Sequence, residues 1–353
     1  MKEATDSAVR LAVIGAGLIG KKHAALIKDL PEACLVAISD VDTAVRRYSE
    51  ELGVAFFEDY SDMLCAVSPD GVIVATPTES HATVGMACAR QGVHMLVEKP
   101  IAHNLHDARL LVDCAGDYHV HLLIGHHRRH NPLVQAAREA VAGGQIGRLV
   151  AVNVLWMLKK PDDYYQVAWR CQSGGGPFLI NLIHDIDNLR YICGEIQRVY
   201  AETSSAVRRL AVEDSGSLCL RFTNGAVGTL LVSDCTPSKW SFEQSTGENP
   251  FYFRTNATCY HFFGTKGSLA FPDMNLVYYE NDTRAGWQYP LASRNFEVQS
   301  KDPLVEQIKH FCKVIKGREA PKITGEDGLR TLAVLLGALD SGKNGEPAEF
   351  AWK

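Results

Sequence analysis

The sequence lacks a long hydrophobic run, a strong excess of charge of either sign and a cluster of cysteines. No stretch of about eighteen apolar residues occurs, so we expect no membrane span. The first ten residues carry charges but no apolar segment, so we expect no secretion signal and a cytoplasmic protein. The formal net charge is −5 and the basic residues are scattered, which predicts a small-molecule partner rather than nucleic acid or an anionic membrane.

The ten cysteines are dispersed, with no C-x-x-C pair and no cysteine and histidine cluster at zinc spacing. We therefore predict no metal site and reduced, mostly buried thiols. Cys171 lies beside a candidate site segment, but a packed, unreactive thiol is the preferred interpretation. A chain of 353 residues is long enough for two domains, each with its own core.

The clearest motif lies in residues 9–23, which read VRLAVIGAGLIGKKH. Four apolar residues predict a strand buried on both faces, and three glycines in the pattern G-x-G-x-x-G precede a helical pattern. In such a unit the glycines allow a tight turn, a close approach of the backbone to a pyrophosphate and close packing of helix on strand. Free N–H groups at the helix start then face the phosphates. The predicted cofactor-binding residues of this turn are Gly15, Gly17, Leu18, Ile19 and Gly20.

An acidic residue follows where a dinucleotide motif needs one. Asp40 stands twenty positions after Gly20, at the end of the next apolar run. A carboxylate there accepts hydrogen bonds from the adenosine ribose hydroxyls, which favours NAD. Arg46 and Arg47 follow closely enough that NADP stays an open alternative.

Residues 9–125 repeat a short β-rich run followed by a helical segment. This alternation predicts an α/β Rossmann domain, a doubly wound parallel sheet covered on both faces. The expected strands are 11–14, 35–39, 54–56, 71–75, 94–97 and 121–124.

From Gln145 onward the pattern changes to apolar runs that flank turn signals such as Asn224-Gly225. It predicts a C-terminal α+β domain with an open, mainly antiparallel sheet. Apolar residues on both faces of two runs suggest that an oligomer covers the open face. We predict a dinucleotide-binding domain at 1–126 and a substrate-binding and oligomerisation domain at 127–353, with the last helices able to pack back on the first domain.

Polar residues follow three strands of the predicted parallel sheet. Ligands bind at the carboxyl ends of such strands, and Lys99 ends one of them. Pro100 restricts Lys99 to extended backbone, and partial desolvation beside nicotinamide would make this lysine a proton carrier near neutrality. A solvated lysine at a strand end is the plainer alternative. The further cofactor-binding residues that we predict are Thr76, Pro77, His81, Glu98 and Lys99.

A second polar segment, residues 169–193, has three glycines before Pro177 and a helical pattern that ends at Cys193. Polar residues of this helix fall on one arc, and apolar residues cover most of its circumference, so the arc is predicted to line a cleft rather than to face solvent. The arc consists of Asn181, His184, Asp185 and Asn188. Aromatic and basic side chains nearby fit the binding of a sugar ring, although packing explains them equally well. The predicted substrate-binding residues are Arg129, Trp169, Arg170, Asn181 and Asp187.

Together these motifs resemble the glucose-fructose oxidoreductase and inositol dehydrogenase family (Gfo/Idh/MocA). The motifs that carry the resemblance are the glycine turn, Ala75-Thr76-Pro77, Glu98-Lys99-Pro100, residues 125–132, Gly174-Gly175-Gly176 with His184-Asp185-Ile186-Asp187, residues 263–267 and residues 324–328. The resemblance implies oxidation or reduction of a sugar or polyol carbon with NAD(P), and a homodimer or homotetramer through the open sheet. It also implies that Lys99 is catalytic and binds substrate, that Pro100 is cis, that His184 is the acid/base and that Asp187 orients substrate or histidine.

One position departs from the family pattern. Inositol-type members carry an aspartate four residues before this histidine, where the present sequence has Ile180, and the nearby polar residue is Asn181. An amide can neither accept the proton nor hold a charge. Two other functions stay open: cleavage of glycosides without net redox change and with retained NAD, and nucleotide sensing without catalysis.

Overall fold

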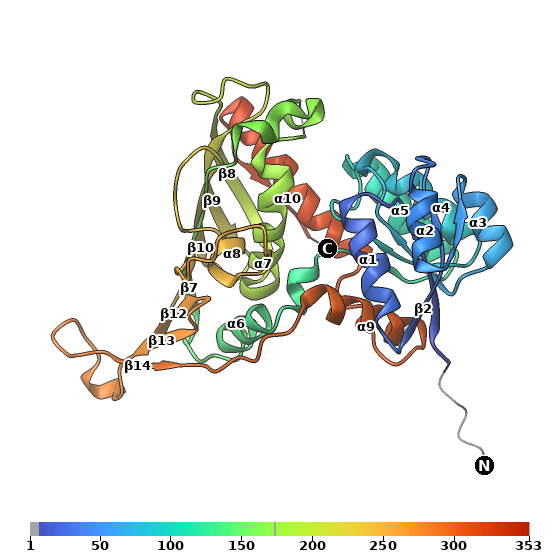
Figure 1. Ribbon diagram of the computed structural model, residues 1–353. Coiled ribbons are helices and arrows are strands. Elements are labelled where there is room, and N and C mark those ends of the chain that lie inside the picture. Colours follow the sequence, from blue (N-terminus) through green and yellow to red (C-terminus); the bar gives the residue numbers. More distant parts are fainter. Residues whose placement is uncertain (1–6, 173, 353) are drawn as a thin grey trace, which may run out of the picture. The chain divides into compact units, whose positions relative to one another are not determined.

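The computed structural model describes residues 7–172 and 174–352 (Figure 1). The first six residues of the predicted first domain and Ser173 of the predicted glycine segment lie outside the described residues. The chain forms two compact units. One contains the described residues up to His130 together with Lys301–Leu332, and the other contains Asn131–Ser300 and the described residues from Ala333 onward. The domain boundaries given above stay a prediction.

The first unit is built on a six-stranded parallel sheet in the order β3-β2-β1-β4-β5-β6. All six predicted strands and the Rossmann architecture are confirmed. Strand order reverses between β1 and β4, which is the point where sheets of this kind bind ligands. The strands are β1 (Val9–Ile14), β2 (Ala33–Ser39), β3 (Ala55–Phe57), β4 (Gly71–Val74), β5 (His94–Val97) and β6 (Leu122–Ile124).

Helices pack their apolar sides against this sheet. Strand β1 is buried from Leu11 to Ile14, and Ile27 of α1 and Phe311 of α9 belong to the same apolar core. Continuous burial of this kind requires cover on both faces of the sheet. The helices are α1 (Leu18–Lys28), α2 (Val45–Leu52), α3 (Tyr60–Val67), α4 (His81–Arg90), α5 (Leu105–Asp117), α9 (Pro303–Ile315) and α10 (Gly325–Asn344), of which α10 continues into the second unit.

The second unit contains a nine-stranded sheet in the order β14-β13-β12-β11-β7-β10-β9-β8-β15. Its neighbours run antiparallel except β7 and β10, which pair in parallel. The predicted mainly antiparallel sheet is confirmed. The strands are β7 (Leu149–Met157), β8 (Ile196–Ser204), β9 (Ser215–Phe222), β10 (Val227–Ser233), β11 (Tyr260–Gly264), β12 (Gly267–Phe271), β13 (Asn275–Tyr278), β14 (Ala292–Asn295) and β15 (Ala348–Glu349).

The two faces of this sheet differ. On one face Val154 and Trp156 of β7 are fully buried in a core that also contains Ile186 of α7. On the other face Val227 and Leu231 of β10 each keep 43 % of their surface exposed. The helices of this unit are α6 (Pro132–Ala142), α7 (Ile183–Cys193) and α8 (Phe242–Thr246).

Two sequence expectations were wrong. The segment after Pro177 is not one regular α-helix, because residues Phe178–Leu182 form a π-helical turn before α7 begins at Ile183. All ten cysteines are free, but they are not mostly buried: only Cys88, Cys193, Cys259 and Cys312 are. Within the described part of the chain, no helix combines the length and apolarity needed to cross a bilayer.

Candidate active site

The glycine turn between β1 and α1 leaves space above the helix start. A Cβ on Gly20 would lie 1.9 Å from the Gly15 carbonyl oxygen, and a Cβ on Gly15 would lie 2.6 Å from the Thr76 nitrogen. The chain itself therefore requires glycine at both positions, and Gly15 also has a φ of +87°. A Cβ on Gly17 would meet nothing within 4 Å. This open space, above the unsatisfied N–H groups of α1, is what a pyrophosphate needs.

Asp40 lies directly beside this turn. Its Oδ2 accepts a hydrogen bond from the Ala16 N–H at 2.6 Å, and its Oδ1 accepts one from Asp42 N–H at 2.9 Å. Arg46 pairs with Glu58 at 3.1 Å, and Arg47 pairs with Glu51 at 3.1 Å. Both arginines thus have carboxylate partners of their own, and the carboxylate fixed at the turn is suited to ribose hydroxyls.

The Glu98-Lys99-Pro100 segment leaves the carboxyl end of β5 and is anchored by a buried carboxylate. Glu98 Oε1 lies 2.8 Å from Nε2 of His23, a residue of α1 with a fully buried side chain, and Glu98 Oε2 accepts the Lys99 N–H at 3.2 Å. A Cβ on Gly125 would lie 2.9 Å from the same carboxylate. The Lys99–Pro100 peptide bond is cis, as the resemblance implies.

The buried carboxylate of Glu98 stays ionised. Burial by itself raises the pKa of Glu98, but the hydrogen bond and charge of His23, with His127 and Lys99, outweigh it and lower the pKa to about 2. Sequence reasoning missed His23. It stands three residues after Gly20, and a histidine at that spacing facing a strand-end glutamate was a signal that could have been used.

His81 also holds this region together. Its Nδ1 lies 2.8 Å from the Pro100 carbonyl oxygen and its Nε2 lies 2.9 Å from the Thr76 carbonyl oxygen. Burial lowers the pKa of His81, and the two carbonyl contacts oppose that lowering. Both ring nitrogens of His81 thus contact backbone carbonyls of the chain. That His81 binds the cofactor stays a prediction. Thr76 accepts a hydrogen bond from Ser80 Oγ at 2.8 Å, and Pro77 is exposed beside it.

Arg129 has a buried ion pair. Its Nη1 lies 3.0 Å from Asp327 Oδ1 at the start of α10, and its side chain is 5 % exposed. Asp327 Oδ2 in turn accepts the Thr324 N–H at 3.0 Å. The guanidinium ties the segment after β6 to the start of α10, and its contact with substrate stays a prediction.

In the second unit the polar arc around His184 is buried. Asn181 is 7 % exposed, His184 8 % and Asp187 1 %, so a solvated helix face is excluded. Asp185 accepts a hydrogen bond from the Tyr260 hydroxyl, to which Asn188 also donates. The Asp187 carboxylate lies 3.9 Å from Nη1 of Arg190 on the same helix. The π-helical turn contains Asn181 of this arc, and such turns are frequent at functional sites.

Of the three glycines, Gly175 and Gly176 are closely packed, whereas a Cβ on Gly174 would meet nothing within 4 Å. A Cβ on Gly175 would lie 2.4 Å from the Trp169 carbonyl oxygen, and one on Gly176 would lie 2.2 Å from the Glu213 carboxylate. Glu213 Oε1 accepts the Phe178 N–H at 3.0 Å and so satisfies a donor at the helix start. Half of the Trp169 surface is exposed, and the Arg170 guanidinium stacks on Tyr164 at 4.0 Å.

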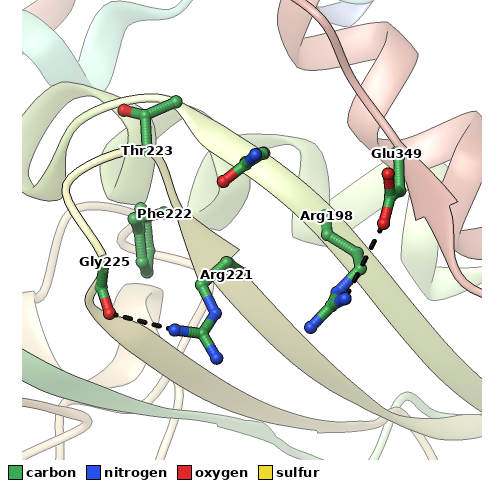
Figure 2. A pocket seen from close by; sticks show the side chains of 7 residues that line it. Arg198, Arg221, Phe222, Thr223, Gly225 and Glu349 are labelled. Atoms are coloured by element: carbon green, nitrogen blue, oxygen red, sulfur yellow. Dashed lines mark hydrogen bonds and ion pairs between the residues drawn. The ribbon is translucent and has the colours of Figure 1, made fainter.

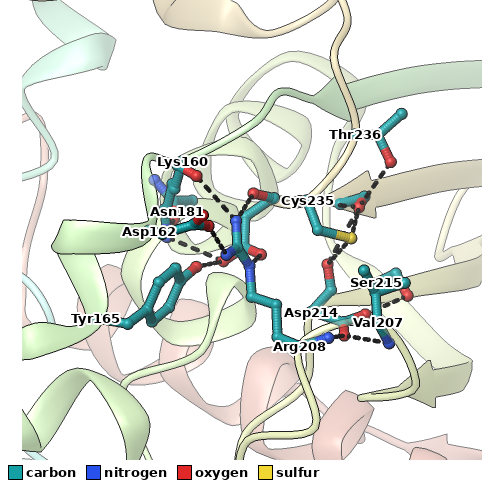
Figure 3. A network of polar contacts seen from close by, with 12 residues as sticks. Lys160, Asp162, Tyr165, Asn181, Val207, Arg208, Asp214, Ser215, Cys235 and Thr236 are labelled. Atoms are coloured by element: carbon teal, nitrogen blue, oxygen red, sulfur yellow. Dashed lines mark hydrogen bonds and ion pairs between the residues drawn. The ribbon is translucent and has the colours of Figure 1, made fainter.

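Sequence reasoning also missed a buried polar network beside Asn181 (Figure 3). It contains Lys160, which follows β7, and Asp234, which follows β10. These two strands pair in parallel, so their carboxyl ends meet at one edge of the sheet. The position of each residue after an apolar run was visible in the sequence, but the pairing of the two runs was not.

A surface hollow lined by none of the predicted site residues is also present. Figure 2 shows a polar hollow along β8, β9 and β15, which is lined by Gln197, Arg198, Arg221, Phe222, Thr223, Gly225 and Glu349. Among the described residues, no group of three or more histidine, cysteine, aspartate or glutamate side chains is arranged to hold a metal ion.

Comparison with known families matches both parts of the chain. Residues 9–126 match the model described as an oxidoreductase family with an NAD-binding Rossmann fold, and residues 134–270 match the GFO/IDH/MocA C-terminal domain. The chain belongs to the GFO/IDH/MocA oxidoreductase family. It is an oxidoreductase, and its cofactor is NAD, which the open space at Gly17 and the fixed carboxylate of Asp40 fit.

Named relatives match nearly the full length. The chain is 30 % identical to myo-inositol 2-dehydrogenase of Thermotoga maritima over 93 % of this chain and 94 % of the relative. It is 30 % identical to 1,5-anhydro-D-fructose reductase of Ensifer adhaerens over 80 % of each. The crystal structure of the WlbA dehydrogenase of Bordetella pertussis in complex with NADH and UDP-GlcNAcA is similar with a TM-score of 0.79 and 25 % identity, covering 98 % of this chain and 100 % of that one.

The glycine turn gives a matched pair of variants. Gly20→Ala places a methyl group against a backbone carbonyl and should lower the free energy of unfolding by about 3 kcal/mol or more. Gly17→Ala meets no protein atom, so stability should change by less than about 1 kcal/mol while the Kd for NADH rises by about 10-fold or more. Urea denaturation and NADH fluorescence titration measure the two effects. Equal loss of stability in both variants would contradict the assignment of the open space to the cofactor.

The Glu98 carboxylate should make stability depend on pH. Its folded pKa of about 2 lies below the ordinary value of 4.5, so its contribution is fully present above about pH 4.5 and is lost as pH falls through the folded pKa. Glu98→Gln should therefore cost on the order of 3 kcal/mol at pH 6, and the gap from the parent should narrow at pH 4 and pH 3. Urea denaturation followed by circular dichroism measures this gap.

Glu58→Gln is the matched control, because Glu58 is exposed and pairs only at the surface with Arg46. It should change the free energy of unfolding by less than about 0.5 kcal/mol at every pH. A Glu98→Gln gap that stays constant from pH 6 to pH 3 would show that Glu98 is not held ionised by His23.

Proposed function

We propose that this chain moves a hydride between NAD and a secondary alcohol carbon of a sugar, cyclitol or related hydroxy compound. The observation that carries the proposal is the anchored Lys99 in the same sheet as the glycine turn. Strands β1 and β5 both pair in parallel with β4, so the turn after β1 and Lys99 after β5 lie at one edge. The relatives named as an inositol dehydrogenase and an anhydrofructose reductase support a polyol or sugar as substrate.

In this proposal Lys99 and His184 handle the proton of the substrate hydroxyl. NAD, when bound, accepts or supplies the hydride at C4 of its nicotinamide. The backbone of Lys99 is fixed by Glu98 and by the bond to Pro100, so its side chain starts from a defined point. His184 stands on a buried helix, and imidazole takes up and releases protons near neutral pH. In this proposal the cofactor-binding residues also include Glu98, Thr76 and Pro77.

The same proposal gives the substrate-binding residues their roles. The half-exposed ring of Trp169 can cover an apolar face of a sugar ring, and Arg170, held over Tyr164, can donate to hydroxyl oxygens. Asn181 and Asp187 supply polar groups from the buried helix. Arg129 would act through its ion pair with Asp327, because that carboxylate already accepts from its guanidinium.

We also propose that a second copy of the chain covers the open face of the nine-stranded sheet, as a homodimer or homotetramer. Val227 and Leu231 of β10 and Phe263 of β11 are at least 40 % exposed there. These side chains alternate with residues of the buried core along their strands, so they all belong to the face away from that core. An apolar sheet face of this kind is typical of an interaction surface.

Activity can be tested by absorbance at 340 nm with NAD or NADP and a panel of sugars, cyclitols and glycosides. The parent should form NADH with one class of compound, and Lys99→Ala and His184→Ala should each lower kcat by about 10² to 10⁴. Lys28→Ala removes an exposed charge from the end of α1 and serves as the control, which should keep parental activity.

Other outcomes identify other functions. Consumption of a glycoside by the NAD complex without net NADH formation would support the redox-neutral cleavage. Binding of NADH without turnover of any compound would support nucleotide sensing. Full activity of Lys99→Ala with the identified substrate would contradict the role given to Lys99.

The oligomer can be tested with a pair of leucine variants. Leu231→Glu places a charge on the open sheet face and should lower the sedimentation coefficient, to that of a monomer for a homodimer and to that of a dimer for a homotetramer. Leu110→Glu is the control, because Leu110 of α5 in the first unit is 41 % exposed, close to the 43 % of Leu231. Dissociation caused by Leu110→Glu, or an unchanged oligomer with Leu231→Glu, would contradict the proposed interface.

A further inference from the structure

Lys160 is a buried lysine that the proposed chemistry does not use. It follows β7, keeps 5 % of its surface exposed and needs acceptors for its ammonium group. The Nζ atom donates to Asn181 Oδ1 at 2.9 Å and lies 3.4 Å from Asp234 Oδ2. Figure 3 shows that this contact joins the end of the strand to the helix that carries the polar arc.

The lysine is held firmly by its surroundings. Asp234 Oδ1 accepts from Arg208 Nε at 3.1 Å, and Asp234 Oδ2 accepts from the Tyr165 hydroxyl. Arg208 also donates to the backbone carbonyls of Lys160 at 2.9 Å and Asp234 at 2.7 Å. Both the backbone and the ammonium of Lys160 are therefore fixed, so the Asn181 side chain faces a donor that cannot move away.

This contact fixes the orientation of the Asn181 amide. A lysine nitrogen surrounded by acceptors donates its hydrogens, so the amide atom facing it must be the oxygen. Burial lowers the pKa of Lys160 and the nearby carboxylates of Asp234 and Glu243 oppose this, but an uncharged amine would still donate to both acceptors. The amide nitrogen occupies the other branch, and no hydrogen bond joins it to another residue within 7–172 and 174–352.

We infer that Lys160 and Asn181 act together as a specificity device, in which Asn181 presents a fixed N–H donor to the substrate. The inference rests on the proposed function, because it assigns a substrate to the same polar arc. The group that meets Asn181 must then be a hydrogen-bond acceptor. A hydroxyl, carbonyl, carboxylate or ether oxygen fits, whereas an amino group, which is protonated near neutral pH and can only donate, is excluded.

The test uses a set of ligands that differ in one group. Each hydroxyl of the compound that gives NADH in the 340 nm assay is replaced in turn by fluorine, which can only accept, and by a protonated amino group, which can only donate. The Kd of each analogue for the NAD complex is measured by calorimetry, so that turnover is not required. A lost or mismatched hydrogen bond at a buried site changes Kd by about 10- to 100-fold.

At one position of the substrate the parent should bind the hydroxyl compound and the fluoro analogue within a few-fold and reject the amino analogue. Asn181→Asp should invert this order, binding the amino analogue about 10- to 100-fold better than the fluoro analogue. Lys160→Met lets the amide rotate, so the penalty against the amino analogue should fall by about 10-fold while the fluoro analogue is still bound.

Lys159→Met is the matched control, because it removes the same charge from the neighbouring exposed position and should keep the parental order. Thermal melting of each variant checks folding, and Asp234 keeps Arg208 and Tyr165 as partners when Lys160 is replaced. The same order of analogues in the parent and in Asn181→Asp at every position overturns the inference but leaves the proposed function intact. Absence of binding by every sugar and cyclitol overturns the proposed function, and this inference with it.

Discussion

The ion pair between the buried carboxylate of Glu98 and His23 is the interaction on which the arrangement of the first unit's candidate site depends. The carboxylate joins three segments that are far apart in the sequence: His23 on the helix after the glycine turn, the backbone of Lys99, and the chain at Gly125. A buried charge of this kind is costly unless it is paired, and the pairing with His23 makes the arrangement specific. Because α1 begins directly after the glycine turn, this one ion pair joins the helix that follows the turn to the segment that carries Lys99.

The second unit repeats the same constraint with different residues. Parallel pairing of β7 and β10 brings Lys160 and Asp234 to one sheet edge, as the parallel sheet of the first unit does for the glycine turn and Lys99. In an otherwise antiparallel sheet, one parallel pair therefore creates one edge where two strand ends carry polar groups. The charges there compensate each other, and the network supports Asn181 rather than forming an open charged site.

Local sequence patterns predicted much of the fold, but they could not predict contacts between residues that are far apart in the sequence. Apolar runs identified all six strands of the first sheet. The signal is strongest where a strand is buried on both faces, as in β4, and weaker for the partly exposed edge strand β3. The strands of the second sheet leave a weaker pattern, because a strand such as β8 alternates buried residues with exposed ones, Arg198 among them. The side-chain partners of Arg129 and His81 are set by tertiary packing, so the sequence could not show the contacts with Asp327 and with backbone carbonyls. The ligand-binding roles of Arg129 and His81 stay predictions.

Asn181 shows why the identity of a residue does not settle its chemistry. An amide offers both a donor and an acceptor, and the sequence could say only that it lacks the charge of an aspartate. The neighbouring Lys160 donates a hydrogen bond to the amide oxygen, so the amide nitrogen is the group that remains to act, as a donor. An ionised carboxylate at position 181 could only accept, so Asn181 and an aspartate there would present opposite hydrogen-bond polarity. In the inference proposed above, the contact that orients the amide therefore carries more information about the substrate than the missing carboxylate does.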